Sequence, residues 1–234
     1  KREVVGFVIC MKKKLVVLDL NGVLVRRELD RGKQEGTLLN NFRVWKRPHC
    51  DEFLAYLFEH FRVAIWSSVR AHNVAAVVGW LMTPEQRKQL VFEWDQEQCM
   101  AVPHPNPAWR DKKPLFMKPV ENIDDEDDVV ICDDDPLKVT DTSKFCQVKT
   151  WDGNENDTHL LELIDKLNLA FLYYFKSSFV GMSQKKIRDI LKRQIDTIIR
   201  RNTIMTQIVR VLNQLFILVV NGNLNILFAG IKIK

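Results

Sequence analysis

The stretch that decides the fold is LVVLDLNGVL at residues 15–24. Its opening residues are apolar and valine-rich, which predicts a strand over 15–20 that is buried on both faces of a parallel sheet. Asp19 and Asn21 stand at the end of this run, directly before Gly22. Ligands of open parallel sheets bind at the carboxyl ends of the strands, so we expect this end to carry function.

Strand-like and helical patterns alternate along the rest of the first two thirds of the chain. Apolar runs predict strands at 62–66, 90–93, 129–132 and 145–149, and amphipathic spacing predicts helices at 51–60, 70–81 and 156–167. Such alternation predicts an α/β fold, a Rossmann-like, mainly parallel sheet flanked by helices. The polar segment 26–45 and the proline-rich segment 101–114 interrupt the pattern, and we expect the second to be neither helix nor central strand.

The charge distribution divides the chain near residue 167. Residues 1–165 carry 23 Lys and Arg against 28 Asp and Glu, whereas residues 166–234 carry 12 against 2. We therefore expect a domain over 1–167 and a basic, helical extension over 168–234. Three alternatives stand for the extension: a helical pair packed on the domain, a binder of anionic surfaces, or sequence from a faulty gene prediction. Its apolar end, 212–233, holds too many asparagines and glycines to predict a membrane segment.

The cysteines indicate a reducing compartment. Five cysteines are scattered along the chain without a C-x-x-C pair, which argues against a disulfide framework and against a zinc site. We expect a nuclear or cytoplasmic location. No signal peptide is evident at the start of the sequence, and the oligomeric state is left open.

Polar side chains follow three of the predicted strands. The first strand ends in Asp19 and Asn21, the second in Ser67 and Ser68, and the third in the run 133–136, Asp-Asp-Asp-Pro. Lys118 lies upstream of the third strand and is preferred over Lys112 and Lys113 as the functional lysine. Because the carboxyl ends of parallel strands meet at one edge of a sheet, we expect these groups to converge.

Phosphoryl transfer is the chemistry that these residue types suit best. A carboxylate can attack phosphorus and split one difficult step into two. Mg²⁺ takes oxygen ligands and needs only one or two carboxylates plus a substrate phosphate. A lysine and a hydroxyl can hold phosphoryl oxygens while negative charge develops.

Four motifs in order resemble those of haloacid-dehalogenase-fold phosphatases of the small CTD phosphatase and NLI-interacting-factor-like type. They are 19–24 (DLNGVL), 65–68 (IWSS), 116–118 (FMK) and 131–136 (ICDDDP), and the run 46–54, KRPHCDEFL, resembles a signature of the same group. Pro119 stands where the family commonly has aspartate. The resemblance covers about 12–167, and it implies that 26–45 is a small flap inserted after the first strand.

The resemblance assigns a role to each residue of the predicted site. Asp19 would be the nucleophile and a ligand of Mg²⁺, whose protein ligands would be completed by the backbone carbonyl of Asn21 and the side chain of Asp134. Ser67, with Ser68 beside it, and Lys118 would hold the phosphoryl group. Members of the family act on phosphoserine or phosphothreonine in proteins, so a phosphorylated protein or peptide is the expected partner. Nucleic acid is not expected to bind directly.

Asn21 departs from the family pattern. The family has an aspartate there, which protonates the leaving group and later activates water, and an amide cannot do either. Losing such a group costs about 10²–10⁴-fold in rate. Deamidation of the Asn21-Gly22 pair would restore an aspartate, but the folded end of a strand opposes closure of the succinimide ring.

Two functions therefore compete. The favoured one is a Mg²⁺-dependent phosphoprotein phosphatase that forms an aspartyl-phosphate on Asp19 and is weakened by Asn21. The other is an impaired pseudophosphatase that binds phosphopeptides or a protein partner through the same groove. A phosphatase for small metabolites is less favoured, because the flap is short and no large cap is inserted. Trp109, in the proline-rich segment, is a candidate for lining a peptide groove.

Overall fold

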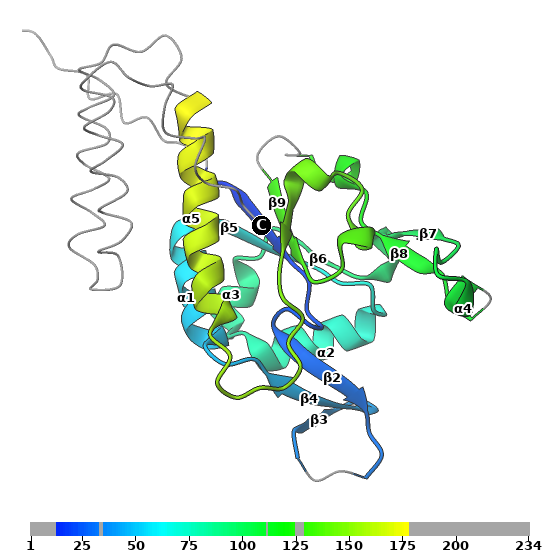
Figure 1. The fold of residues 1–234 in the computed structure, drawn as a ribbon. Coiled ribbons are helices and arrows are strands. Elements are labelled where there is room, and N and C mark those ends of the chain that lie inside the picture. Colours follow the sequence, from blue (N-terminus) through cyan, green and yellow to red (C-terminus); the bar gives the residue numbers. More distant parts are fainter. Residues whose placement is uncertain (1–12, 33–34, 111, 125–128, 178–234) are drawn as a thin grey trace, which may run out of the picture. The chain divides into compact units, whose positions relative to one another are not determined.

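A five-stranded parallel sheet forms the centre of the fold in the computed structural model, which describes residues 13–32, 35–110, 112–124 and 129–177 (Figure 1). The strand order is β10-β9-β1-β5-β6, and every neighbouring pair is parallel. The strands are β1 (Leu15–Leu18), β5 (Arg62–Trp66), β6 (Glu93–Trp94), β9 (Val129–Asp133) and β10 (Phe145–Gln147). The prediction of an α/β fold with a mainly parallel sheet is confirmed.

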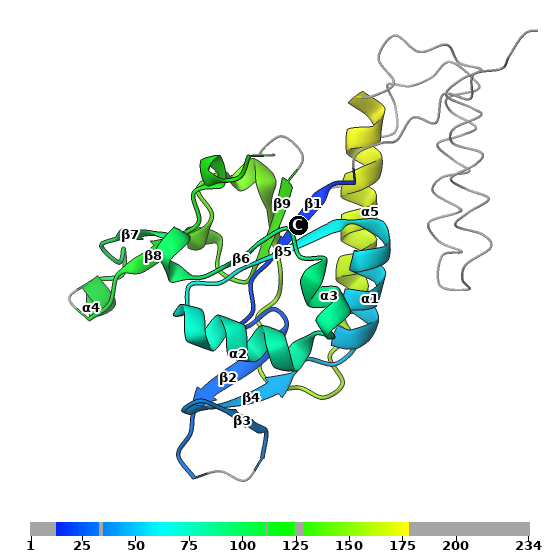
Figure 2. The same ribbon diagram turned by 180° about the vertical axis from the view of Figure 1, so that it is seen from behind.

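The predicted helices are present, with shifted ends. They are α1 (Cys50–His60), α2 (Ala71–Leu81) and α5 (His159–Ser177), and a short α3 (Pro84–Lys88) follows α2. Thr83 and Gln86 form a capping box at the start of α3, so its first turn is stabilised by two reciprocal hydrogen bonds. Figures 1 and 2 show α1 and the start of α5 side by side, where the Tyr56 hydroxyl donates to Asn168 over 2.9 Å.

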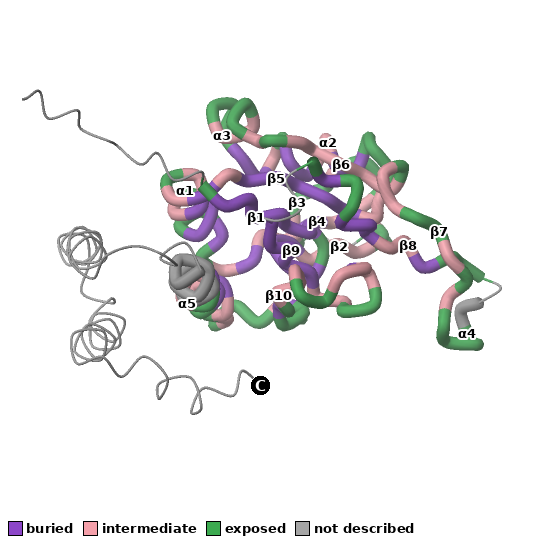
Figure 3. Tube along the Cα trace, turned by 90° about the horizontal axis from the view of Figure 1, so that it is seen from above, coloured by how far each residue is buried: buried purple, intermediate pink, exposed green. Residues whose placement is uncertain are grey.

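The core lies on both faces of the three central strands (Figure 3). The residues on one face pack against the short segments before and after β9. The buried members of this cluster are Leu15, Val17, Ala64, Trp66, Val120, Ile123, Val129, Ile131 and Val139. The intervening strand residues, such as Val16, Leu18 and Ile65, are equally buried. Burial on both faces explains why β1 is a continuous apolar run.

The flap is a separate three-stranded antiparallel sheet with the order β2-β4-β3. Its strands are β2 (Val25–Leu29), β3 (Thr37–Leu39) and β4 (Phe42–Lys46). The turn joining β3 to β4 touches the start of α2, where the side chain of Asn40 donates to that of Asn73 over 3.1 Å. At the other end of β4, the Lys46 ammonium lies 5.6 Å from the ring centre of Trp80 on α2. The flap therefore packs along α2, as Figures 1 and 2 both show.

Two predictions of local structure need correction. The proline-rich segment contains a short helix, α4 (Pro107–Arg110), whose first residue is a proline, a position where the missing N–H needs no partner. The ends of this segment join a two-stranded hairpin of β7 (Met100–Val102) and β8 (Leu115–Met117), outside the central sheet as expected. The strand predicted at 90–93 begins only at Glu93; before it, Val91 N donates to Val63 O and Phe92 O accepts from Ile65 N, which join the preceding residues to β5.

Short 3₁₀ turns fill the connections around β9. They are η1 (Gln96–Gln98), η2 (Val120–Asn122), η4 (Pro136–Lys138) and η5 (Thr142–Lys144). Asp135 caps η4 and Asp141 caps η5, each accepting a hydrogen bond from the backbone N–H two residues later. The turn η4 is the one that matters for the site, because it carries Lys138 back toward the end of β9.

The chain divides into two compact units, Lys1–Leu169 and Ala170–Lys234. Most of the second unit lies outside the described residues, as does almost all of the predicted basic extension, so its boundary and role stay predictions. Among the described residues, no helix combines the length and the apolar character needed to cross a membrane.

Candidate active site

The polar ends of β1 and β9 meet at one edge of the sheet. Leu18 is paired with Cys132, so the residues that follow them, Asp19 and Asp133, lie next to each other across the two strands. The N–H of Asp19 donates to the carbonyl of Cys132 over 3.0 Å and fixes the start of the following turn. The sequence prediction that these carboxylates converge is therefore matched by the geometry.

Asp19 is almost fully buried, and one of its carboxylate oxygens accepts no hydrogen bond. Its side chain is 1% exposed, and Oδ1 has no hydrogen-bond partner although it lies 3.3 Å from Nζ of Lys118. A buried carboxylate oxygen without a hydrogen bond is costly unless a ligand or ion completes its environment. Oδ1 of Asp19 is therefore available to a ligand or an ion.

Lys118 is a fully buried lysine held by two carboxylates. Its ammonium donates to Asp133 Oδ2 over 2.5 Å and approaches Asp19. Burial would lower the pKa of Lys118, but the charges of Asp19 and Asp133 outweigh burial and raise it. Burial would likewise raise the pKa of Asp133, yet Lys118 and Lys138 lower it. Both groups therefore stay charged, and Lys118 is placed to stabilise an anion beside Asp19.

Lys138 is a second lysine of the cluster, which the sequence motifs do not single out. Its Nζ lies 3.6 Å from Asp19 Oδ2, 3.4 Å from Asp133 Oδ1 and 3.6 Å from Asp134 Oδ1. Burial lowers its pKa, but the surrounding carboxylates raise it well above the ordinary value. The only sequence signal was its spacing, four residues after Asp134, and that spacing has meaning only once η4 is known to turn the chain back.

The side chain of Asp134 packs directly against Gly22, in the turn after Asp19, where a larger residue does not fit. Gly22 has a φ of 84°, and a Cβ built on it would lie 2.1 Å from Asp134 Oδ2. One oxygen from each of Asp19, Asp133 and Asp134 falls within 4.8 Å of the others. Burial, together with the charges of Asp19 and Asp133, raises the pKa of Asp134 despite the opposing effect of Lys138. This set of hard oxygen donors suits a small divalent cation.

The remaining predicted residues lie at or near the same edge. Ser67 follows β5 and is 1% exposed, and its N–H donates to the carbonyl of Trp94, while Ser68 is half-buried. Asn21 is exposed to solvent at the mouth of the site. The side chain of Trp109 lies outside the described residues. The structure thus brings together Asp19, Lys118 and Asp134, and it places no described atom of the proline-rich helix among them.

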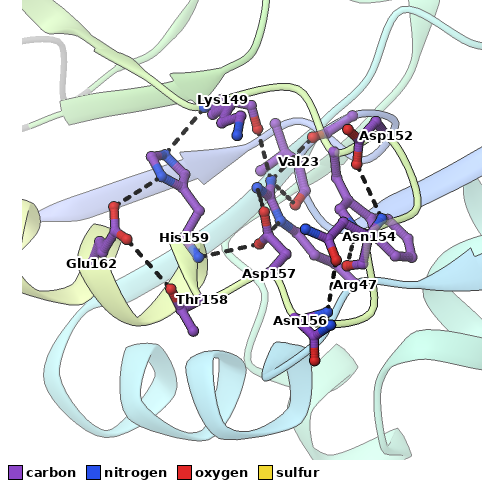
Figure 4. A network of polar contacts seen from close by, with 12 residues as sticks. Val23, Arg47, Lys149, Asp152, Asn154, Asn156, Asp157, Thr158, His159 and Glu162 are labelled. Carbon is purple, nitrogen blue, oxygen red and sulfur yellow. Dashed lines mark hydrogen bonds and ion pairs between the residues drawn. The ribbon is translucent and has the colours of Figure 1, made fainter.

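Arg47, from the run that resembles the family signature, is a structural residue beneath the site (Figure 4). Its guanidinium is fully buried and donates to the carbonyls of Gly22, Val23 and Lys149 and, through two nitrogens, to both oxygens of Asp157. It therefore fixes the turn that carries Asn21 and Gly22. The polar contacts continue to His159, whose Nε2 accepts from Lys149 N. Burial and nearby cations lower the pKa of His159, consistent with a neutral acceptor ring.

Residues 14–177 match the profile of a family described as NLI interacting factor-like phosphatase. The chain belongs to this family. An uncharacterised FCP1 homology domain-containing protein of Schizosaccharomyces pombe is 35% identical over 92 residues, which are 39% of this chain and 38% of that protein. A CTD phosphatase-like protein of Invertebrate iridescent virus 3 is 34% identical over 90 residues, which are 33% of this chain and 48% of the viral protein.

Solved structures of the family resemble the chain at low identity. A structure of the fission yeast RNA polymerase II CTD phosphatase Fcp1, an R271A variant bound to beryllium fluoride, is 13% identical, with a TM-score of 0.46 over 90% of this chain and 67% of that one. A second structure of Fcp1 gives a TM-score of 0.45 at the same identity. The chain spans less than half the length of the two curated relatives it matches.

Proposed function

We propose that this phosphatase-family domain hydrolyses phosphoserine or phosphothreonine in proteins through an aspartyl-phosphate on Asp19, with turnover weakened by Asn21. The observation that carries the proposal is the buried Asp19 carboxylate, whose free Oδ1 faces the buried ammonium of Lys118. A nucleophile, an anion-stabilising cation and an acidic cluster fit for a cation are all in place. A site that had lost its function would be expected to have lost several of them.

In the first step, Asp19 Oδ1 attacks phosphorus, a new O–P bond forms, and the bond to the serine or threonine oxygen breaks. The electron pair of that bond leaves with the oxygen, which takes a proton from water because Asn21 has none to give. Lys118 stabilises the charge on the phosphoryl oxygens, assisted by the hydroxyl of Ser67. Water then attacks phosphorus of the aspartyl-phosphate, the bond from Asp19 to phosphorus breaks, and its electron pair returns to the carboxylate. The attacking water gives up a proton to the hydroxide left by the first step, and phosphate is released.

Mg²⁺ is the cofactor that fits the donor set. Asp19, Asp134 and the backbone carbonyl of Asn21 would hold it, and oxygen ligands with room for waters are what this ion prefers. When bound, it would supply positive charge to the phosphoryl oxygens. In formal charges, three carboxylates oppose two lysines in the cluster, so the site carries one net negative charge. A divalent cation would change this to one net positive charge before an anionic phosphate enters.

The substrate class follows from the small flap. The flap, β2 to β4, is a small three-stranded sheet, and the described residues include no large cap inserted after β1. An open mouth suits a phosphorylated side chain presented by a protein better than a small metabolite that must be enclosed. The names of the curated relatives point the same way, and a nuclear or cytoplasmic location would give access to such substrates.

Asn21 is the observation that favours a second function. Its side chain is exposed at the mouth of the site, where a general acid would have to stand, and no other acidic side chain among the described residues takes that place in the cluster. A domain with this site would still bind phosphate through Lys118 and the cation. The second candidate is therefore a phosphopeptide-binding pseudophosphatase.

The test compares phosphate release from an aryl phosphate and from a phosphoserine peptide, with and without Mg²⁺. The enzyme reading predicts turnover by the wild type, loss of turnover in Asp19→Asn, and a strong preference for the aryl substrate, because a phenolate leaves without help from an acid. Asn21→Asp should raise peptide turnover by about 10²-fold or more. Activity in Asn21→Asp alone would show that natural turnover is lost and would favour the binding function instead.

Asn41→Asp is the matched control for the gain of activity. Asn41 is an exposed asparagine on the flap, so this variant adds the same negative charge away from the end of β1. It should behave as the wild type on both substrates. A wild type whose turnover survives Asp19→Asn would contradict the aspartyl-phosphate mechanism.

A further inference from the structure

Arg27, on the flap strand β2, is a half-buried arginine with one buried hydrogen-bond donor that is unused. Its Nη1 is buried and has no hydrogen-bond partner. The two arginines nearest to it on the flap are both satisfied: Arg26 bonds to Glu28 and to the carbonyl of Asp152, and Arg43 bonds to Asp30 and to the carbonyl of Gly36. A guanidinium has five N–H donors, and a donor that is buried rarely lacks an acceptor. The unpartnered Nη1 therefore indicates that Arg27 binds a ligand.

The flap holds the Arg27 side chain on its inner face. Arg27 is paired with Val44 across β2 and β4, and directly paired residues lie on the same face of a sheet. Val44 and Val25, which share this face, are both 1% exposed, whereas Leu29 at its far end is 57% exposed, so the half of the face nearer to Val25 points into the protein. The guanidinium carbon lies 4.3 Å from the ring centre of Phe42, a stacking contact that restricts its motion.

The same strand starts beside Asp19. The turn after Asp19 closes through a bridge between Asn21 and Val25 and a hydrogen bond of 2.8 Å from Gly22 N to Val25 O. Arg27 is two residues beyond Val25 on the same face, about 7 Å along the strand. The charges of Arg27 and Asp19 interact. Burial lowers the pKa of Arg27, and the Asp19 carboxylate offsets part of that lowering.

The formal charges of the site become balanced when Arg27 is included. Three carboxylates are opposed by Lys118, Lys138 and Arg27, which leaves no net charge. A divalent cation then gives the site a charge of two, which a phosphomonoester dianion neutralises. Both lysines contact carboxylates of the cluster, whereas Nη1 of Arg27 is a buried donor without an acceptor that could add to Lys118 in binding an anion.

We propose that Arg27 binds the phosphoryl group of the substrate from the flap side of the site. This inference rests on the proposed function, because it assumes that a phosphoryl group is bound at Asp19. The planar guanidinium can donate two parallel hydrogen bonds to phosphoryl oxygens, which fixes the orientation of the group as well as attracting its charge. The competing explanation is that Arg27 only packs on Phe42.

The probe is inorganic phosphate, whose affinity is measured by calorimetry at a fixed concentration of Mg²⁺ with the full chain. Arg27→Met should weaken phosphate binding by about ten- to a hundred-fold, the effect of losing a charge-assisted pair of hydrogen bonds. Arg27→Lys should recover only part of the loss, because an ammonium lacks the forked geometry. Arg31→Met, which removes the same charge from an exposed position on the flap, should leave the affinity unchanged.

Thermal melting of each variant separates binding from packing. If Arg27→Met lowers the melting temperature while phosphate affinity stays within about threefold of the wild type, Arg27 is a packing residue and the proposal is wrong. If Arg27→Met does not fold, the comparison of wild type with Arg27→Lys decides, and equal affinities overturn the proposal. Failure of the folded wild type to bind millimolar phosphate also overturns it.

Phosphate binding does not require turnover, so this result and the proposed function can fail separately. Arg27-dependent binding in a protein without Asp19-dependent turnover would support the inference and reject the enzyme. Turnover that depends on Asp19 but not on Arg27, with a phosphate affinity that Arg27→Met leaves unchanged, would support the enzyme and reject the inference.

Discussion

Arg47 and Asp157 form a two-pronged ion pair across 110 residues of sequence, with N–O distances of 2.8 and 3.0 Å. The guanidinium is fully buried and the carboxylate is 10% exposed. Because Arg47 also holds the carbonyls of Gly22 and Val23, the pair connects the segment before α5 to the turn after Asp19. The geometry of the candidate site and the stability of the domain therefore depend on the same contact.

Removal of Asp157 should be strongly destabilising. Asp157→Ala leaves the Arg47 charge buried without its partner, which costs about 3–5 kcal/mol of the free energy of unfolding. The matched control is Asp51→Ala, which breaks the ion pair with Lys46; Asp51 is 75% exposed, so the cost should be below about 1 kcal/mol. Urea denaturation monitored by tryptophan fluorescence measures both. Equal losses in the two variants would contradict the structural role of Arg47.

The effect of Asp157 should depend on pH in a defined direction. Burial would raise the pKa of Asp157, but the hydrogen bonds and charge of Arg47 outweigh it and lower the pKa below its ordinary value of 3.8. A carboxyl whose pKa is lower in the folded state stabilises the fold above the unfolded value and loses that contribution as the pH falls through the folded value. The difference between wild type and Asp157→Ala should thus be constant near neutrality and shrink below pH 3.8. A constant difference across that range would exclude the ion pair as its source.

The sheet and much of the site could be predicted because their signals are local. A valine-rich run predicts a buried strand, and parallel strands bring their ends together, so Asp19, Asp133 and Ser67 could be assigned to one edge before their positions were known. Lys118 was chosen over two nearby lysines only because of the motif around it. The structure places its ammonium between two carboxylates.

The groups that escaped prediction depend on long-range packing or strand register. Lys138 reaches the cluster only because η4 reverses the chain after Asp135. The inward direction of Arg27 depends on its pairing with Val44, and Arg26, its neighbour on the same strand, points to the other face. The partner of Arg47 lies in a loop whose sequence carries no sign of a buried ion pair. Composition alone cannot reveal any of these three contacts.

Gly22→Ala should disrupt the site more than it disrupts the fold. A φ of 84° is strained for alanine, which costs about 1–3 kcal/mol. The added Cβ would also lie 2.1 Å from Asp134 Oδ2 and would push that carboxylate away from Asp19. We expect a modestly destabilised, folded protein whose Mg²⁺ affinity, measured by calorimetry, is greatly reduced.

Gly32→Ala provides the comparison for this effect. Gly32 also has a positive φ, of 77°, but no atom lies within 4 Å of a Cβ built there. It should share the backbone strain and keep the affinity for Mg²⁺. Equal affinities in the two variants would show that Asp134 does not need its place against Gly22.

Lys138→Met should increase the affinity for Mg²⁺. The Lys138 ammonium lies within 3.6 Å of an oxygen of Asp19, Asp133 and Asp134, so it competes with a divalent cation for the same carboxylates. Two like charges this close repel by several kcal/mol even at an effective dielectric constant of about 20, and we expect affinity to rise by at least about tenfold. Calorimetric titration with Mg²⁺ measures the change. Weaker binding in Lys138→Met would mean that the lysine positions the ligands instead of competing with the ion.

Asn21 should stay an amide in the folded protein and become labile when the chain unfolds. Closure of the succinimide ring needs the Gly22 nitrogen to attack the Asn21 side chain, but that nitrogen donates to Val25 O over 2.8 Å and Gly22 is fixed in a left-handed turn. Incubation of native protein and of protein in urea, followed by mass spectrometry of the peptide, compares the two states. The Asn221-Gly222 pair of the same chain is the reference in urea, where both pairs should deamidate at similar rates. Conversion of Asn21 to aspartate in the native protein, in step with a gain in phosphatase activity, would instead mean that the missing acid is restored after synthesis.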